Sequence, residues 1–108
     1  MIKIAVLKVG QPLSVQEIDG GLKSMQQLVG GFIQMVPISD GIELVCNEEG
    51  KFAGLPVNFK LGMDRIVGDV FFTRTDDEGE PASLTDEDLS YLNEWTRQMR
   101  TQPFSQVH

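Results

Sequence analysis

Turn-forming residues interrupt this chain at short intervals, and the apolar runs between them are short. They gather at Gly10-Gln11-Pro12, Gly30-Gly31, Asp40-Gly41, Asn47-Glu48-Glu49-Gly50 and Pro56. The Gly, Pro, Asn and Asp residues of these segments favour turns through their backbone angles or through a local side-chain hydrogen bond. The sequence between them therefore predicts short strands and helices, and no run reaches the length of a membrane-spanning helix.

The N-terminal segment, residues 2–9, predicts a strand that is apolar on both faces. Its side chains alternate between two sets, Ile2, Ile4 and Val6 on one face and Ala5, Leu7 and Val9 on the other. Strands of this kind lie inside a sheet that is covered on both sides. We therefore expect a central strand here, and we expect residues 13–18 to return beside it as a second strand.

A short helix is predicted between two glycine pairs. Leu22, Met25, Leu28 and Val29 have the spacing of one apolar helical stripe. Asp19 precedes this stripe as a helix-start signal. Gly30-Gly31 follows it and can supply the left-handed backbone that ends a helix.

Residues 32–38, 42–46 and 51–55 predict an antiparallel meander of three strands. Asp40-Gly41 suits the positive φ angles of a tight hairpin turn. Pro56 stops the last of the three strands. Beyond it, residues 58–64 are predicted to be irregular or a short strand. Residues 66–73 are predicted to be a strand in which Gly68 marks a bulge or a close backbone contact.

The last predicted element is a helix over residues 85–100. Thr85 caps its start and Asp88 follows three residues later, which is a variant of the capping box. Four apolar side chains share one face of this helix, namely Leu89, Leu92, Trp95 and Met99. We expect Trp95 to anchor the helix on the sheet.

The predicted fold class is α+β, with a small mixed or antiparallel sheet of about five strands. One short helix follows the second strand, and the C-terminal helix packs on the sheet. A chain of 108 residues fits one domain, which we assign to residues 1–102, with residues 103–108 as a flexible tail. No secretory signal is recognised at the N-terminus, and the lone Cys46 suits a reducing compartment. A cytoplasmic location is therefore expected, without contact with a membrane.

Acidic residues are concentrated near the C-terminus. The chain has a net charge of −7, and half of its 16 acids lie in residues 76–94, which contain no base. They are Asp76, Asp77, Glu78, Glu80, Asp86, Glu87, Asp88 and Glu94. Affinity for nucleic acid comes from clustered Lys and Arg, so direct nucleic-acid binding is not expected.

The central part of the sequence resembles a known family. Residues 28–37, 41–51 and 54–58 combine a helix end, a double glycine, a strand, an Asn-Glu-Glu-Gly turn and a Leu-Pro-x-Asn segment. Over residues 3–73 this pattern resembles the DUF3846 family. The resemblance implies an accessory protein of a phage, plasmid or other mobile element, and it implies no assigned activity. The family-like part is taken as residues 1–74, and the acidic loop and helix of residues 75–102 are expected to lie outside the family pattern.

No catalytic, metal-binding or cofactor-binding constellation is recognised in the sequence. Cys46 continues the apolar face of Ile42 and Leu44, so a buried core thiol is favoured over a nucleophile. His108 is the only histidine and stands at the end of the chain. The usual general base of hydrolases is therefore missing from the interior.

One polar cluster is a candidate ligand-binding site. Its members are Asn47, Glu48, Glu49, Lys51 and Asn58. A turn and a proline-bounded loop could bring them together at one end of the meander, and carboxylates beside asparagine can bind a cation or a polar ligand. The alternative is that Asn47 and Gly50 only satisfy turn geometry while the two glutamates face water.

The acidic segment is a candidate partner-binding surface, formed by Asp76, Asp77, Glu78 and Glu80. The alternative is ordinary helix design, because Asp86, Glu87 and Asp88 would stabilise the positive end of the helix dipole. A mimic of DNA would need charge spread over a longer face.

These observations favour a non-enzymatic binding protein that acts on a host protein or intercepts a small host ligand. Three alternatives stay open: an enzyme with a weak activity built on carboxylate and hydroxyl side chains, an acidic DNA-mimic inhibitor, or a purely regulatory or structural module that maintains the mobile element. A free strand edge also predicts a homodimer.

Overall fold

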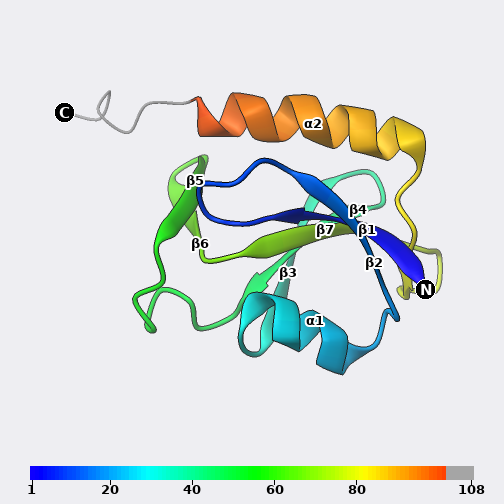
Figure 1. Cartoon of the computed structure of the whole chain (residues 1–108), viewed down its shortest axis with the longest axis horizontal. Helices are drawn as coiled ribbons and strands as arrows, with labels where there is room; N and C mark the ends of the chain where they lie inside the picture. Colours follow the sequence, from blue (N-terminus) through cyan, green and yellow to red (C-terminus); the bar gives the residue numbers. More distant parts are fainter. Residues whose placement is uncertain (102–108) are drawn as a thin grey trace.

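The computed structural model describes residues 1–101, in which an antiparallel sheet lies between two helices (Figure 1). The elements along the chain are β1 (Ile2–Leu7), β2 (Ser14–Ile18), α1 (Leu22–Val29), β3 (Ile33–Ser39), β4 (Ile42–Asn47), β5 (Val57–Leu61), β6 (Asp64–Val67), β7 (Val70–Thr75), β8 (Pro81–Ala82) and α2 (Asp86–Arg100). The main sheet has the order β2-β1-β7-β4-β3, with β8 beside β7, while β5 and β6 form a separate hairpin. The predicted α+β class is confirmed, and the predicted tail lies outside the described residues.

Strand β1 is central, as predicted. It pairs antiparallel with β2 on one side and with β7 on the other. Its Ala5 and Leu7 belong to the core on the α2 side of the sheet, whereas Ile4 and Val6 belong to the core on the α1 side. The two apolar faces read from the sequence are therefore both covered.

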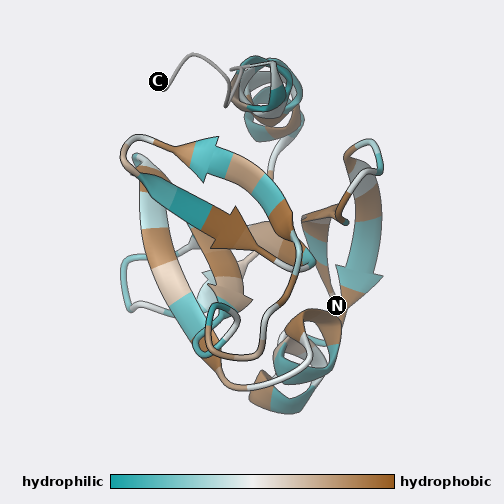
Figure 2. Ribbon diagram, turned by 90° about the vertical axis from the view of Figure 1, so that its left-hand side faces the viewer, coloured by the Kyte–Doolittle hydropathy of each residue, from teal (hydrophilic) through white to brown (hydrophobic). Residues whose placement is uncertain are grey.

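Helix α2 and the β5–β6 hairpin cover the same face of the main sheet. The ring of Trp95 meets Phe59 of β5 edge-on, with centroids 5.7 Å apart, and meets Phe72 of β7 at 5.8 Å. Figure 2 looks along this helix and shows the sheet between it and α1. Trp95 thus joins the helix to the sheet and the hairpin, as expected from its position on the apolar stripe.

The predicted meander is only partly correct. Strands β3 and β4 form the expected hairpin, and Gly41 at its turn has a φ of 78°. Residues 51–54 are a turn instead of a third strand, and β4 pairs with β7 on its other side. Phe71 and Phe72 of β7 are both completely buried, so β7 contributes more apolar surface to the middle of the sheet than residues 51–55 could.

The segment after Pro56 forms the second hairpin. Strands β5 and β6 pair across a turn at Gly62, whose φ is 60°. The strand predicted over residues 66–73 is broken at Gly68, which has a φ of 77° and separates β6 from β7. Glycine suits this position because of its positive φ. The Gly68 N–H donates to the Pro56 carbonyl at 2.7 Å, so the predicted close backbone contact is confirmed and the predicted bulge within one strand is not.

The predicted end of α1 and the predicted start of α2 are confirmed. The predicted start of α1 at Asp19 is wrong, because Gly21 is the N-cap and no side chain caps the helix. Asp19 Oδ1 instead accepts from the Gly21 N–H at 2.8 Å, in the turn before the helix. Helix α1 ends at Gly30 with a φ of 80°. At the start of α2, the backbone N–H of Asp88 donates to Thr85 Oγ1 at 3.0 Å, and the N–H of Thr85 donates to Asp88 Oδ2 at 2.9 Å. Among residues 1–101, neither helix has the length and apolar character needed to cross a membrane.

Candidate functional site

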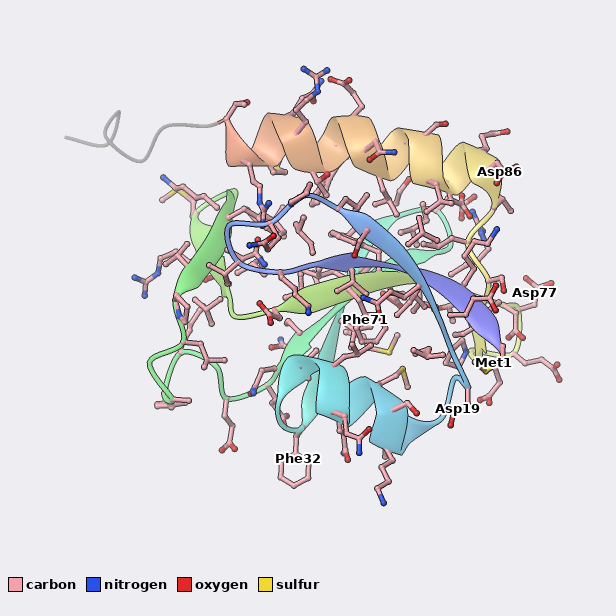
Figure 3. All side chains as sticks on the ribbon, viewed as in Figure 1. Met1, Asp19, Phe32, Phe71, Asp77 and Asp86 are labelled. Carbon is pink, nitrogen blue, oxygen red and sulfur yellow. The ribbon has the colours of Figure 1, made fainter. Side chains whose placement is uncertain are left out.

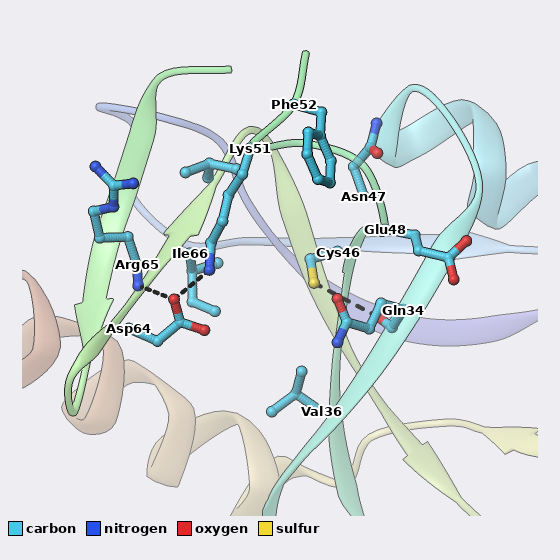
Figure 4. Close-up of a pocket in the computed structure, with 11 residues that line it drawn as sticks. Gln34, Val36, Cys46, Asn47, Glu48, Lys51, Phe52, Asp64, Arg65 and Ile66 are labelled. Carbon is cyan, nitrogen blue, oxygen red and sulfur yellow. Dashed lines mark hydrogen bonds and ion pairs between the residues drawn. The ribbon is translucent and has the colours of Figure 1, made fainter. Parts of the chain in front are cut away.

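A cavity of about 180 Å³ lies between the β3–β4 hairpin and β6 (Figure 4). Gln34 and Val36 of β3 contribute to one side, next to Cys46 of β4. Asp64 and Ile66 of β6 contribute to the other side. The cavity thus exists because the separate β5–β6 hairpin stands beside the edge of the main sheet.

An ion pair between Lys51 and Asp64 spans part of this cavity. Lys51 Nζ donates to Asp64 Oδ1, and the backbone N–H of Arg65 donates to the same oxygen at 2.7 Å. The hydrogen bond from Lys51, together with that from Arg65, lowers the pKa of Asp64. Both side chains of the pair are at least half exposed. Exposed pairs of this kind add little to stability, so the ammonium group is available to a ligand.

The thiol of Cys46 faces the cavity from the apolar face of β4. It donates to the carbonyl oxygen of Gln34 at 3.7 Å, and burial raises its pKa. A raised pKa keeps the thiol protonated and weakens it as a nucleophile. Cys46 shares the core with Ile42 and Leu44, which confirms its prediction as a buried core thiol.

The aromatic ring at the cavity was not recognised from the sequence. Phe52 is 94% exposed and lines the cavity from the turn after Gly50 (Figure 4). In the predicted meander it was a strand residue, so no exposed position was expected. The available signal was its location beside the Asn-Glu-Glu-Gly turn, where a large apolar side chain has little sheet to cover it.

Three of the five predicted cluster residues line the cavity. They are Asn47, Glu48 and Lys51. Asn47 also holds the turn together, because its Nδ2 donates to the Val29 carbonyl at 3.1 Å and its Oδ1 accepts from the Glu49 N–H at 2.8 Å. Glu49 is exposed and does not line the cavity. Both ends of the Asn47 amide are therefore engaged within the protein, as the turn interpretation predicts, although Asn47 borders the cavity.

Asn58 lies apart from this cluster. Its Nδ2 donates to the carbonyls of Leu7 at 2.8 Å and Gly68 at 2.9 Å, and its Oδ1 accepts from Arg100 Nη2 at 2.7 Å. Both ends of the amide are thus occupied by the protein itself. The expected convergence of Asn58 with Asn47 is corrected: Asn58 joins the end of β1 to the loop before β7 and to α2.

The family model for the domain of unknown function DUF3846 matches residues 2–99 of this chain. The chain belongs to the DUF3846 family. No curated protein and no solved structure gave a significant match. The DUF3846 match includes the acidic loop and α2, so the expectation that residues 75–102 lie outside the family pattern is wrong. The family pattern continues beyond the resembling segment, residues 3–73, through the acidic loop and nearly all of α2.

The acidic loop of this DUF3846 domain joins β7 to β8. Asp76 is engaged internally, since its Oδ1 accepts from the N–H groups of Glu78 and Glu80, each at 2.9 Å. Asp77, Glu78 and Glu80 are exposed. Asp77 and the β5–β6 hairpin lie at opposite ends of the molecule (Figures 1 and 3). The two predicted surfaces of the DUF3846 domain are therefore separate.

Proposed function

We propose that this DUF3846 protein is a non-enzymatic binding protein that holds a small polar ligand of its host cell in the cavity beside β6. The observation that supports this most is the exposed Phe52 next to the Lys51–Asp64 ion pair. A stacking surface and a cation stand together at one cavity, and neither contributes much to the hydrophobic core.

The lining of the cavity indicates the chemistry of the ligand. Its volume of about 180 Å³ is below the roughly 300–1,000 Å³ of sites for drug-sized molecules, so the ligand is small. The face of Phe52 suits a planar ring. Lys51 can exchange Asp64 for an anionic group of the ligand, and the amide of Gln34 can donate or accept. A small aromatic carboxylate has all of these features.

The side chains at the cavity favour binding over catalysis. The cysteine at the wall has a raised pKa and is bonded to a carbonyl. A nucleophilic thiol needs a lowered pKa and a neighbouring base. Cys46 has a raised pKa, and its thiol donates to a carbonyl oxygen, which is not a base. The proposal also includes an origin in a phage or other mobile element. A protein of this origin that binds a ligand of the host cell would act in the host cytoplasm.

The experiment is a titration with a panel of small aromatic carboxylates, followed through the backbone amide resonances of the protein. Binding should shift the resonances of Gln34, Lys51 and Phe52. Lys51→Gln should weaken binding about tenfold or more, which corresponds to about 1.4 kcal/mol and is within the range of a hydrogen bond to a charged group.

Two matched variants control for general effects. Lys23→Gln removes an exposed lysine on α1, and Met63→Ala removes a fully exposed apolar side chain from the tip of the β5–β6 hairpin. Neither residue lines the cavity, so neither change should alter the affinity. Binding that survives both Lys51→Gln and Phe52→Ala at full strength would show that the cavity is not the site.

A second candidate function is docking of a basic host protein on the acidic loop. It is favoured by the exposure of Asp77, Glu78 and Glu80, whose negative charges are not balanced by a basic residue in the loop. Association through exposed charges should be fast and should weaken as salt is added. Replacing these three acids by Asn and Gln should slow association and reduce its salt dependence in a surface-binding assay against the captured partner.

A further inference from the structure

Strand β3 forms one edge of the main sheet and carries no charged residue. It is the last strand in the order β2-β1-β7-β4-β3, and its sequence is Ile-Gln-Met-Val-Pro-Ile-Ser. Natural edge strands are usually protected against pairing by charged side chains, proline, bulges or covering elements. In β3 the proline and the register shift lie at Pro37–Ser39, so they leave residues 33–36 unprotected. The opposite edge strand, β2, contains Glu17, whereas β3 exposes Met35, which is 37% exposed, and is preceded by Phe32, which is 63% exposed.

The backbone groups on the free side of β3 can be identified from one hydrogen bond. The N–H of Glu48 donates to the Phe32 carbonyl at 2.8 Å. In an antiparallel ladder, hydrogen-bonded pairs alternate with non-bonded pairs, so Gln34 and Val36 also direct their backbone groups toward β4. The N–H and C=O groups of Ile33 and Met35 consequently point away from the sheet. Pro37 is the next outward position and has no N–H to offer.

We propose that a second copy of this chain pairs with the free edge of β3, antiparallel and about a two-fold axis at Gln34. In this register Ile33 of one copy lies opposite Met35 of the partner subunit. In each such pair the two N–H groups donate to the two carbonyls of the opposite residue. All four outward groups of Ile33 and Met35 are therefore hydrogen-bonded in both copies. The sheet continues from one subunit into the next.

Proline and a helix end exclude the neighbouring registers. A two-fold axis at Met35 would place Ile33 opposite Pro37 of the partner subunit, and the Ile33 carbonyl would lose its donor. An axis at Ile33 would place Met35 opposite Gly31 of the partner subunit, whose N–H is already bonded to the Gln26 carbonyl at 3.1 Å in each chain. The axis at Gln34 is the arrangement in which no outward group of Ile33 or Met35 is left unpaired.

The dimer would also bring the partner subunit next to the cavity. Gln34 lines it and would lie next to Gln34 of the partner subunit in a non-hydrogen-bonded pair, where side chains are closest. The two cavities would therefore adjoin across the axis. The dimer itself does not depend on the proposed ligand.

Sedimentation velocity over a range of concentrations tests the proposal. Met35→Pro removes one outward N–H and should weaken the dimer about tenfold or more, because two symmetric hydrogen bonds are lost. Val15→Pro is the matched control. Lys3, whose N–H donates to Ser83 Oγ and whose carbonyl accepts from Leu84 N–H, directs its groups away from β2. By the same alternation, the Val15 N–H points to the free side of β2.

The expected result is a dimer in the wild type and in Val15→Pro, and a monomer in Met35→Pro at the same concentration. A wild-type monomer at about 1 mM, a concentration at which even a pair of millimolar affinity would be substantially dimeric, would overturn the proposal. Loss of the dimer in Val15→Pro alone would overturn it as well, because the contact would then lie on β2.

A measurement on the unmodified chain covers the case in which a proline variant fails to fold. Amide hydrogen exchange at Ile33 and Met35 should slow as the protein concentration is raised, because these amides become bonded in the dimer. Exchange at Val15 and Glu17 should be independent of concentration. Fast exchange at Ile33 and Met35 at every concentration would contradict pairing at this edge.

Discussion

Arg74 and Asp88 form a bidentate ion pair that joins β7 to the first turn of α2. Arg74 Nε donates to Asp88 Oδ2 at 2.9 Å, and Nη2 donates to Oδ1 at 2.7 Å. The carboxylate also accepts the capping hydrogen bond from the Thr85 N–H. Only 6% of Asp88 is exposed. One acidic residue therefore both caps the helix and attaches it to the sheet.

This arrangement makes stability depend on pH below about 4. The hydrogen bonds from Arg74, with those from Thr85, lower the pKa of Asp88 from 3.8 to about 2. Because the pKa is lower in the folded state, the stabilisation is complete above pH 4 and is lost as the pH falls through 2. The lowered pKa of Asp88 corresponds to about 2–3 kcal/mol at most. Urea unfolding between pH 5 and pH 2 should show this loss.

Two variants separate Asp88 from the other acids in that experiment. Asp88→Asn should remove its part of the pH dependence between pH 4 and pH 2. Asp86→Asn, in the same helical turn but without the arginine, should lose only the roughly 0.3–1 kcal/mol of a helix-dipole contact. Equal pH profiles in the wild type and Asp88→Asn would count against the assigned role of the pair.

Truncation of Trp95 should be costly. Its ring contacts Phe59 of the hairpin and Phe72 of the sheet, and Trp95→Ala should lower the free energy of unfolding by about 3–5 kcal/mol, as other large aromatic deletions do. Trp95 is the only tryptophan, so its fluorescence reports on helix docking. An emission maximum equal to that of free tryptophan in water would mean that α2 is not docked.

Replacement of Asn58 should affect the fold and leave the proposed ligand site intact. Asn58→Asp cannot donate to the carbonyls of Leu7 and Gly68, and a buried acceptor that loses its donor costs about 1–3 kcal/mol. Thermal or urea unfolding measures this cost. Affinity for a cavity ligand should be unchanged in the folded fraction. If Asn58→Asp kept full stability but bound the ligand more weakly, Asn58 would belong to the ligand site.

The acids of the β7–β8 loop should differ in their effect on stability. Asp76→Ala removes the acceptor of two backbone N–H groups and should cost about 0.5–1.5 kcal/mol for each hydrogen bond. Replacing Asp77, Glu78 and Glu80 together by Asn and Gln should change stability by less than about 0.5 kcal/mol. Parallel urea titrations test this contrast, which an unstructured loop would not produce.

The elements predicted correctly are those specified by local chemistry. The capping residues Thr85 and Asp88 lie three positions apart, and the glycine that ends α1 directly follows its apolar stripe. Such signals involve neighbours in the sequence, so one sequence contains them completely. The apolar positions of β1 were equally clear, because alternation is a local property of a strand.

The errors concern pairing between distant segments. The partners of β4 are β3, which is adjacent in the sequence, and β7, which begins at Val70. Nothing local distinguishes Val70 from the residues after Gly50 as the next partner. The ion pair of Asp88 was missed for the same reason, because Arg74 precedes it on another element. At the site, Lys51 was predicted but Asp64 was not, since a hairpin of its own brings Asp64 to the cavity.

The central position of β7 has a consequence for the synthesis of the protein. Strand β7 lies between β1 and β4 and pairs with both. While residues 70–75 are still inside the ribosome, the main sheet can form only as two separate hairpins, β1–β2 and β3–β4, each with its inner edge unpaired. Isolated two-stranded hairpins are marginally stable in water. The domain therefore cannot complete its main sheet during translation until β7 has emerged.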